Sequence, residues 1–309
     1  MLPVIVLSAL LVRAAEGPPI IKGSDEFEFT YRIKLPEIKG QARLWLPLAK
    51  TDAFQVVVQE SMDTSIKWEK VADRDYHNDI CVLHPGPNDR GKTIELHYRV
   101  VRKEKTAYSS NGESPARFLQ PEKLVPINET FKTLAEQATA GKTNDLDRAK
   151  ALYGHVLSRM RYDKSGTGWG KGDAVYACDA KTGNCSDFHS YFIALARSIG
   201  IPARFAIGAT IPADKNEGPI EGYHCWAEFF ADGRWVPVDI SEAWKNPKLA
   251  EYYFGHNPAN RFELTKGRDL VVDPAPTGGP INFLVYPILE MEGNAVKPET
   301  SFSFKRTGA

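Results

Sequence analysis

The sequence lacks an excess of charge of either sign, because 39 Lys and Arg residues balance 39 Asp and Glu residues. A protein that holds nucleic-acid phosphates or an anionic membrane through its overall field carries a surplus of positive charge. Cysteine is also scarce, with four residues among 309, which is too few for a fold held together by disulfides. We therefore expect a globular protein with no nucleic-acid partner and no disulfide framework.

Long apolar runs are missing as well. The run from Leu2 to Val12 has eleven residues, whereas a membrane-spanning helix needs about 20, so we expect no integral membrane segment. Ala15-Glu16-Gly17 follows with the small residues of a signal cleavage site, although no Lys or Arg precedes the run. We interpret residues 1–17 as a signal peptide and expect export to the periplasm or medium. A buried strand or a misplaced start codon is the alternative.

The first half of the chain has the pattern of β-structure. From Glu26 to Leu35, apolar and polar residues alternate, which is typical of a half-buried antiparallel strand, and the pattern returns at 94–100. Shorter runs at 42–46, 54–59 and 80–83 lie between turn-rich pieces. This spacing predicts a β-sandwich-like domain over residues 23–104.

Helical patterns follow a polar linker at 102–118. Asn128 and Asn144 are suitable N-caps for two helices, and the apolar spacing over 186–199 predicts a buried helix that Gly200 ends. The glycine-rich segment 164–172 lacks the Gly-Lys-Ser/Thr ending of a nucleotide-binding loop, so we interpret it as a lip of a cleft. Near the C-terminus, 282–286 has the composition of a strand that docks on one of the domains.

Cys185 lies at the start of the predicted helix over 186–199. Free N–H groups and the helix dipole favour a thiolate there, and the same N–H groups can receive a developing oxyanion. Cys185 is therefore our candidate nucleophile.

The candidate base is His224, in a predicted hairpin that turns at Asp232-Gly233. A two-residue turn there pairs residues whose numbers sum to 465, which places His224 opposite position 241 and Asp239 one diagonal step away on the same face. An imidazole and a carboxylate can meet across that diagonal. Asp239 can then orient the ring of His224 and stabilise its imidazolium, while the other ring nitrogen faces the thiol.

Four segments together resemble the transglutaminase-like superfamily, whose members share a papain-like α+β fold. They are Gly183-Asn184-Cys185, Gly200-Ile201-Pro202-Ala203-Arg204, His224-Cys225-Trp226-Ala227-Glu228 and Trp235-Val236-Pro237-Val238-Asp239. The resemblance implies an α+β protein in which the sandwich-like domain precedes a transglutaminase-like core at 115–267 and a short C-terminal β extension at 268–309. It also implies that Cys185 is the nucleophile, His224 the general base and acid, and Asp239 the orienting carboxylate. The superfamily's second oxyanion donor is often a side chain upstream of the cysteine, and Trp169 is a candidate although no motif aligns it.

Several other residues have competing interpretations. His189, one helical turn after Cys185, is an alternative base, although a histidine at that offset more often packs or caps. Cys225 alternates away from His224 and should face the other side of the sheet; it either pairs with Cys178 in a disulfide or stays a buried free thiol. The seven histidines have no metal-ligand spacing, and 214–218 lacks the spacing of a calcium loop, so we expect no metal and no cofactor.

These residues predict a thiol-dependent enzyme that acts on amide bonds of a protein or peptide through an acyl-enzyme at Cys185, with hydrolysis favoured over cross-linking. Transamidation of a glutamine side chain is the second hypothesis. The third is a non-catalytic exported binding protein that keeps the fold. The sequence identifies neither the substrate nor the oligomeric state.

Overall fold

The computed structural model describes residues 19–110 and 112–308. The predicted signal peptide at 1–17 lies outside the described residues. Within them, no helix is both long and apolar enough to cross a membrane.

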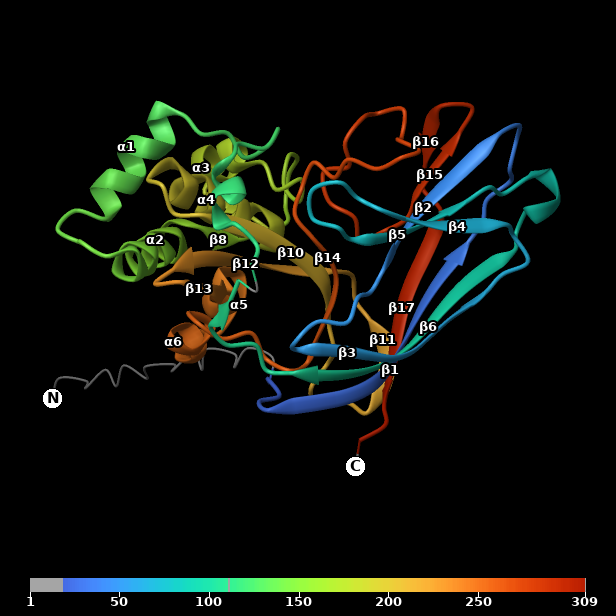
Figure 1. The fold of residues 1–309 in the computed structure, drawn as a ribbon, viewed down its shortest axis with the longest axis horizontal. Coiled ribbons are helices and arrows are strands. Elements are labelled where there is room, and N and C mark those ends of the chain that lie inside the picture. Colours follow the sequence, from blue (N-terminus) through green and yellow to red (C-terminus); the bar gives the residue numbers. More distant parts are fainter. Residues whose placement is uncertain (1–18, 111, 309) are drawn as a thin grey trace, which may run out of the picture.

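Two five-stranded antiparallel sheets form the predicted sandwich (Figure 1). The long strands alternate between buried and exposed side chains, as the sequence pattern predicts. The first sheet has the order β11-β17-β1-β6-β3, and the second has the order β16-β15-β2-β5-β4. The strands of the first sheet are β11 (Glu217–Ile220), β17 (Glu299–Arg306), β1 (Ser24–Lys34), β6 (Thr93–Lys103) and β3 (Gln55–Asp63). Those of the second are β16 (Asn294–Val296), β15 (Ile288–Met291), β2 (Ala42–Leu48), β5 (Asp79–Leu83) and β4 (Trp68–Ala72).

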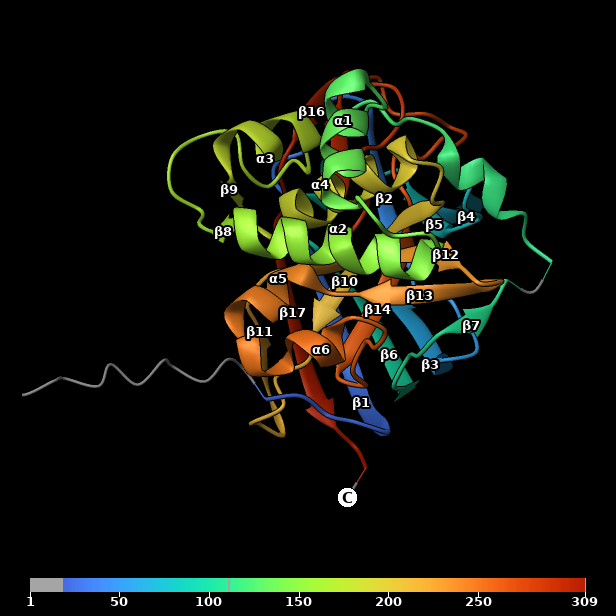
Figure 2. The same cartoon turned by 90° about the vertical axis from the view of Figure 1, so that its left-hand side faces the viewer.

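The second unit is a five-stranded sheet with helices on one side (Figures 1 and 2). Its order is β14-β10-β12-β13-β7, and the buried helix α4 packs against β10 and β12. The strands are β14 (Arg261–Lys266), β10 (Ala203–Thr210), β12 (His224–Ala231), β13 (Arg234–Val238) and β7 (Tyr108–Ser109). The helices are α1 (Glu129–Ala138), α2 (Asp145–Arg159), α3 (Ala174–Ala180), α4 (Cys185–Ser198), α5 (Ile240–Lys245) and α6 (Ala250–Tyr253). Short strands β8 (Arg161–Tyr162) and β9 (Thr182–Gly183) pair in parallel before α4. Both predicted N-caps are confirmed, since Asn128 and Asn144 each accept a backbone N–H of the helix that follows.

The C-terminal segment joins the sandwich through β15, β16 and β17. In particular, β17 lies between β1 and β11, so a strand from the far end of the chain pairs with one from the middle. The predicted strand at 282–286 is wrong, because the backbone there bonds side chains instead of a neighbouring strand. Thr265 Oγ1 donates to the carbonyl of Leu284 at 2.6 Å, and Tyr31 OH donates to that of Val285 at 2.8 Å. The segment nevertheless docks as expected, with Phe283 against Phe205.

The sandwich covers the outer edge of the helical unit's sheet at β14. Gln55 bonds both the N–H and the carbonyl of Glu263, at 2.8 and 2.9 Å, and Asn78 does the same for Lys266, at 2.8 and 2.7 Å. The two amide side chains therefore satisfy an edge that would otherwise expose unpaired backbone groups. Lys105 adds a buried ionic contact between the two units. Its Nζ lies 3.0 Å from a carboxylate oxygen of Glu228 on β12 and 3.0 Å from one of Glu263 on β14.

Candidate active site

Cys185 is the first residue of α4 and is 2% exposed. Asn184 caps the helix, and its side chain accepts the N–H of Ser186 at 2.9 Å. The carboxylate of Asp187 accepts the N–H of Asn184 at 2.9 Å, which completes a capping box. None of the hydrogen bonds among the described residues uses the N–H of Cys185, so this donor is available beside the sulfur.

Glycines allow the chain to pack tightly against this first turn. Gly183 has φ +154°, and a Cβ there would overlap the side chain of Asp187. The N–H groups of Gly170 and Gly172 donate to the same carboxylate at 2.7 and 3.0 Å. Asp187 therefore fastens the end of the glycine-rich loop to the turn that carries Cys185.

The hairpin register confirms the pairing predicted from the turn. Ala227 pairs with Val238 and Ala231 with Arg234, so the residue numbers sum to 465. Pairing ends at Val238, because Asp239 turns the chain into α5 as its N-cap, and the predicted strand position 241 is helical. His224 Nε2 lies 2.6 Å from Asp239 Oδ2 in a buried pair, which leaves Nδ1 as the nitrogen free to face the thiol.

The electrostatics of these groups favour a thiolate next to an imidazolium. Burial alone would lower the pKa of His224, but the charge and hydrogen bond of Asp239, with a hydrogen bond to Cys185, raise it to about 9. Burial alone would likewise raise the pKa of Cys185. Hydrogen bonds from Cys225 and His224, and the positive charge of His224, instead hold it well below its ordinary value. The pKa of Asp239 is also lowered against the effect of burial, chiefly by the charge of His224.

Arg261, on β14, is a second cation beside the carboxylate and was not found from the sequence. Its Nη2 lies 3.5 Å from Asp239 Oδ2, and the side chain is 1% exposed. Because its charge opposes a proton on the neighbouring ring, Arg261 acts to lower the pKa of His224. No local sequence pattern indicates a role for Arg261, because the pairing of β14 with β10 is what brings it close to Asp239.

Tyr223 is another residue that the sequence analysis missed. Its hydroxyl lies 2.9 Å from both Asn184 Nδ2 and Ser186 Oγ, so it contacts the first turn of α4 directly. Burial and the charge of Cys185 raise the pKa of Tyr223, which keeps the hydroxyl protonated at neutral pH. Its ring packs against Phe283 and Tyr286, which brings the C-terminal segment to the site.

Trp169, the candidate oxyanion donor, is half-buried in the glycine-rich loop. Next to Trp169, the N–H of Gly170 bonds Asp187. Two residues further along the loop, Arg268 holds the backbone. Arg268 donates to the carbonyls of Gly172 at 2.5 Å and Lys171 at 3.0 Å, and also to Ser190 on α4. The loop therefore lies at the N-terminus of α4, and the role of Trp169 stays a prediction.

His189 lies in a structural position. Its Nδ1 is 2.8 Å from the carbonyl of Cys185, and its Nε2 accepts the N–H of Ile240 at 3.0 Å. Nε2 therefore carries no proton, and Nδ1 donates. Burial lowers the pKa of His189, in keeping with this neutral form. The residue ties α4 to α5, so the two elements that carry Cys185 and Asp239 are held in place.

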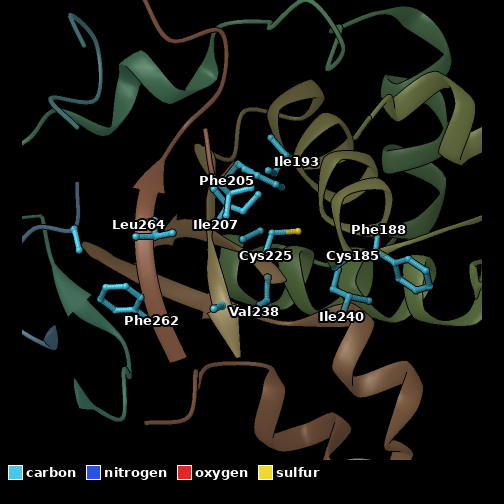
Figure 3. Packing of buried hydrophobic residues seen from close by; sticks show 14 of the residues in the cluster. Cys185, Phe188, Ile193, Phe205, Ile207, Cys225, Val238, Ile240, Phe262 and Leu264 are labelled. Carbon is cyan, nitrogen blue, oxygen red and sulfur yellow. The ribbon is translucent and has the colours of Figure 1, made fainter. Parts of the chain in front are cut away.

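Cys178 and Cys225 are both free thiols with different neighbours. Cys178 contributes to the raised pKa of Tyr191 and so lies beside it, whereas Cys225 points from β12 toward α4 (Figure 3). Its sulfur lies 3.8 Å from Ser186 Oγ and 3.7 Å from His189 Nδ1. Over residues 19–110 and 112–308, no three His, Cys, Asp or Glu side chains gather as metal ligands.

Cys185 at the N-terminus of α4, His224 on β12 and Asp239 at the start of α5 thus form a Cys–His–Asp arrangement in an α+β fold. Residues 132–240 match the sequence profile of the transglutaminase-like superfamily. An uncharacterized protein of Haemophilus influenzae is 26% identical, over 91% of this chain and 89% of its own length. The uncharacterized protein YebA of Bacillus subtilis is 29% identical, over 50% of this chain but only 22% of its own length.

One solved structure shares the whole architecture. A protein of Cytophaga hutchinsonii described as a candidate cysteine protease superposes with a TM-score of 0.63, at 14% identity. The match covers 93% of this chain and 99% of the other. This likeness, with the family match, confirms the predicted α+β fold with a sandwich beside a transglutaminase-like core.

Proposed function

We propose that the protein is a thiol-dependent acyl-transfer enzyme that acts on amide bonds of a protein or peptide and favours hydrolysis. The observation that carries this proposal is the buried pair of His224 and Asp239 beside Cys185 at the start of α4. The Cytophaga neighbour, described as a candidate protease, is in line with hydrolysis. We also propose that the protein acts after export, to the periplasm or outside the cell, as the signal-like first residues predict.

The first half of the reaction forms the acyl-enzyme. The Cys185 thiolate attacks the carbonyl carbon of the amide, and the negative charge moves to the carbonyl oxygen. The N–H of Cys185 and the positive end of α4 stabilise that oxyanion, with Trp169 as the proposed second donor. His224 gives its proton to the leaving nitrogen, the C–N bond breaks, and the amine departs.

The second half regenerates the enzyme. Neutral His224 takes a proton from water, and the resulting hydroxide attacks the thioester carbonyl. The C–S bond then breaks, which releases the acid and restores the thiolate beside the imidazolium. Asp239 holds the ring in one orientation through both halves. If a primary amine takes the place of water, the same steps transfer the acyl group to that amine.

Mass spectrometry of peptides incubated with the purified protein tests this proposal. Hydrolysis adds water at the cleaved bond, whereas transamidation of glutamine adds the amine and releases ammonia. We expect turnover to fall by at least about 1,000-fold in Cys185→Ala and to persist in the matched control Cys178→Ala. Full turnover in Cys185→Ala would exclude the mechanism. A Cys185 no more reactive than Cys178 would favour the binding-protein alternative.

A further inference from the structure

Cys225 is a buried thiol next to the nucleophile that the proposed mechanism does not use. Its side chain leaves the sheet on the side that α4 covers and points at the first turn of that helix (Figure 3). Ser186 and His189, whose polar atoms lie 3.8 and 3.7 Å from its sulfur, follow Cys185 in α4 by one residue and by about one helical turn. The two thiols also shift each other's pKa, downward for Cys185 and upward for Cys225, in keeping with side chains that lie next to each other.

We propose that Cys185 and Cys225 form a redox pair, in which peroxide oxidises Cys185 and Cys225 resolves the product as a reversible intramolecular disulfide. The inference rests on the activated thiol of the proposed function, because a thiolate reacts with peroxide and a thiol does not. It adds an oxidative control of the same site.

Two balanced steps describe the chemistry. In the first, the Cys185 thiolate attacks one oxygen of hydrogen peroxide and the O–O bond breaks. The other oxygen leaves as water with the proton of the His224 imidazolium, and Cys185 becomes a sulfenic acid. In the second, the Cys225 sulfur attacks the Cys185 sulfur, the S–O bond breaks, and hydroxide leaves as water with the Cys225 proton. The two thiols lose two electrons in all, and peroxide is reduced to water.

The surroundings of Cys225 exclude it from the first step. Burial and the hydrogen bond to Cys185 raise the pKa of Cys225, so it stays a thiol while Cys185 is a thiolate. His189 does not activate it as a base, since Nδ1 already donates to the Cys185 carbonyl and Nε2 accepts from Ile240. The other two cysteines lie elsewhere, with Cys178 against Tyr191 and Cys81 buried in β5.

The experiment follows each cysteine after brief exposure of the full chain to hydrogen peroxide. Remaining thiols are blocked with N-ethylmaleimide, and the protein is digested with trypsin without reduction. Because Lys or Arg residues separate them, the four cysteines fall in four tryptic peptides, 75–90, 172–181, 182–197 and 216–234. We expect peptides 182–197 and 216–234 to appear linked, lighter by two hydrogens than their sum. Dithiothreitol should restore the reactivity of Cys185 toward iodoacetamide.

Three variants sharpen the result. Cys225→Ala puts a smaller side chain in the same space and should lose the linked species. Its Cys185 should then pass to the sulfinic acid, with loss of most of the recovery in dithiothreitol. Cys225→Ser should behave as Cys225→Ala does, and Cys178→Ala should behave as wild type. Thermal melts establish that each variant is folded.

The failure of this proposal is distinguishable from that of the proposed function. Fast alkylation of Cys185 at neutral pH, with sulfinic acid accumulating equally in wild type and Cys225→Ala, would overturn the redox pair alone. Slow alkylation of Cys185, with no oxidation by peroxide, would overturn both.

Discussion

At the scale of single residues, the charge on Cys185 depends on a proton that His224 holds. Ordinary cysteine has a pKa of about 8.5, so its alkylation rises about tenfold for each pH unit below that value. A thiolate held by the imidazolium reacts at a rate that changes little between about pH 5 and 8. We expect this flat profile in wild type and the steep one in His224→Ala, measured with iodoacetamide and peptide mass spectrometry. The same slope in both proteins would contradict the pairing.

Asp239 raises the pKa of His224, and Arg261 lowers it. The raised pKa of about 9 means that the imidazolium is held through neutral pH and lost as the pH rises through 9. Asp239→Asn removes the charge that raises this pKa, and burial then lowers it, so the ring should be neutral at pH 7.5. Arg261→Met should move the pKa upward instead. Nitrogen NMR of the His224 ring measures both shifts, and shifts of the same sign would refute the assignment.

At the scale of elements, the start of α4 is fixed by glycine as much as by its cap. Gly183→Ala forces φ +154° on an alanine and drives its Cβ into Asp187. We expect a loss of about 2 kcal/mol, or roughly 4–8 °C in Tm, with slower alkylation of Cys185 because the loop at Gly170 loosens.

Gly200, at the other end of the same helix, is the matched control. Its φ is +82°, but an added Cβ would meet nothing within 4 Å. Gly200→Ala should therefore cost only about 1 kcal/mol and leave the alkylation rate unchanged. Equal effects on Cys185 from the two variants would show that helix stability, and not the contact with Asp187, controls the thiol.

The features that could be predicted from the sequence are those that residues close together in the chain determine. The caps Asn128 and Asn144, the helix start at Cys185 and the hairpin that brings His224 to Asp239 all follow from local spacing. Arg261 and Tyr223 could not be found this way, because their contacts arise from strand pairing and loop packing between distant segments. The docking of 282–286 without a strand has the same cause, since Tyr31 and Thr265 bind its carbonyls.

At the scale of the whole molecule, buried charge joins the sandwich to the helical unit. The pKa of Lys105 is raised by Glu228 and Glu263 although burial opposes it. Lys105→Met leaves two buried carboxylates without this partner, which should cost about 3–5 kcal/mol of unfolding free energy at pH 7. The cost should shrink at pH 4, because the carboxylates of the variant can take up protons there, whereas in wild type Lys105 holds the pKa of both below the ordinary value.

Urea unfolding at the two pH values measures this difference. Lys150→Met is the control, because Lys150 pairs with Glu251 in solvent and should contribute little to stability. A cost for Lys105→Met that does not change with pH would show that lost packing, and not unpaired charge, is responsible.

The sandwich also reaches the candidate site through a chain of aromatic rings. Phe302 on β17 packs against Tyr31 at 4.7 Å and stacks on Tyr286 at 5.6 Å, and Tyr286 meets Tyr223 at 5.7 Å. Because Tyr223 bonds Asn184 at the cap of α4, we expect a loss of packing in the sandwich to reach Cys185. We therefore expect the two units to unfold together.

Phe302→Ala tests this coupling, with an expected loss of about 3–5 kcal/mol for a buried aromatic ring. Alkylation of buried Cys81 in β5 reports on the sandwich, and that of buried Cys225 in β12 reports on the helical unit. In rising urea, both midpoints should fall by the same amount, whereas Ser301→Ala on the exposed face of β17 should move neither. A shift confined to Cys81 would mean that the helical unit folds independently and that the aromatic chain carries no coupling.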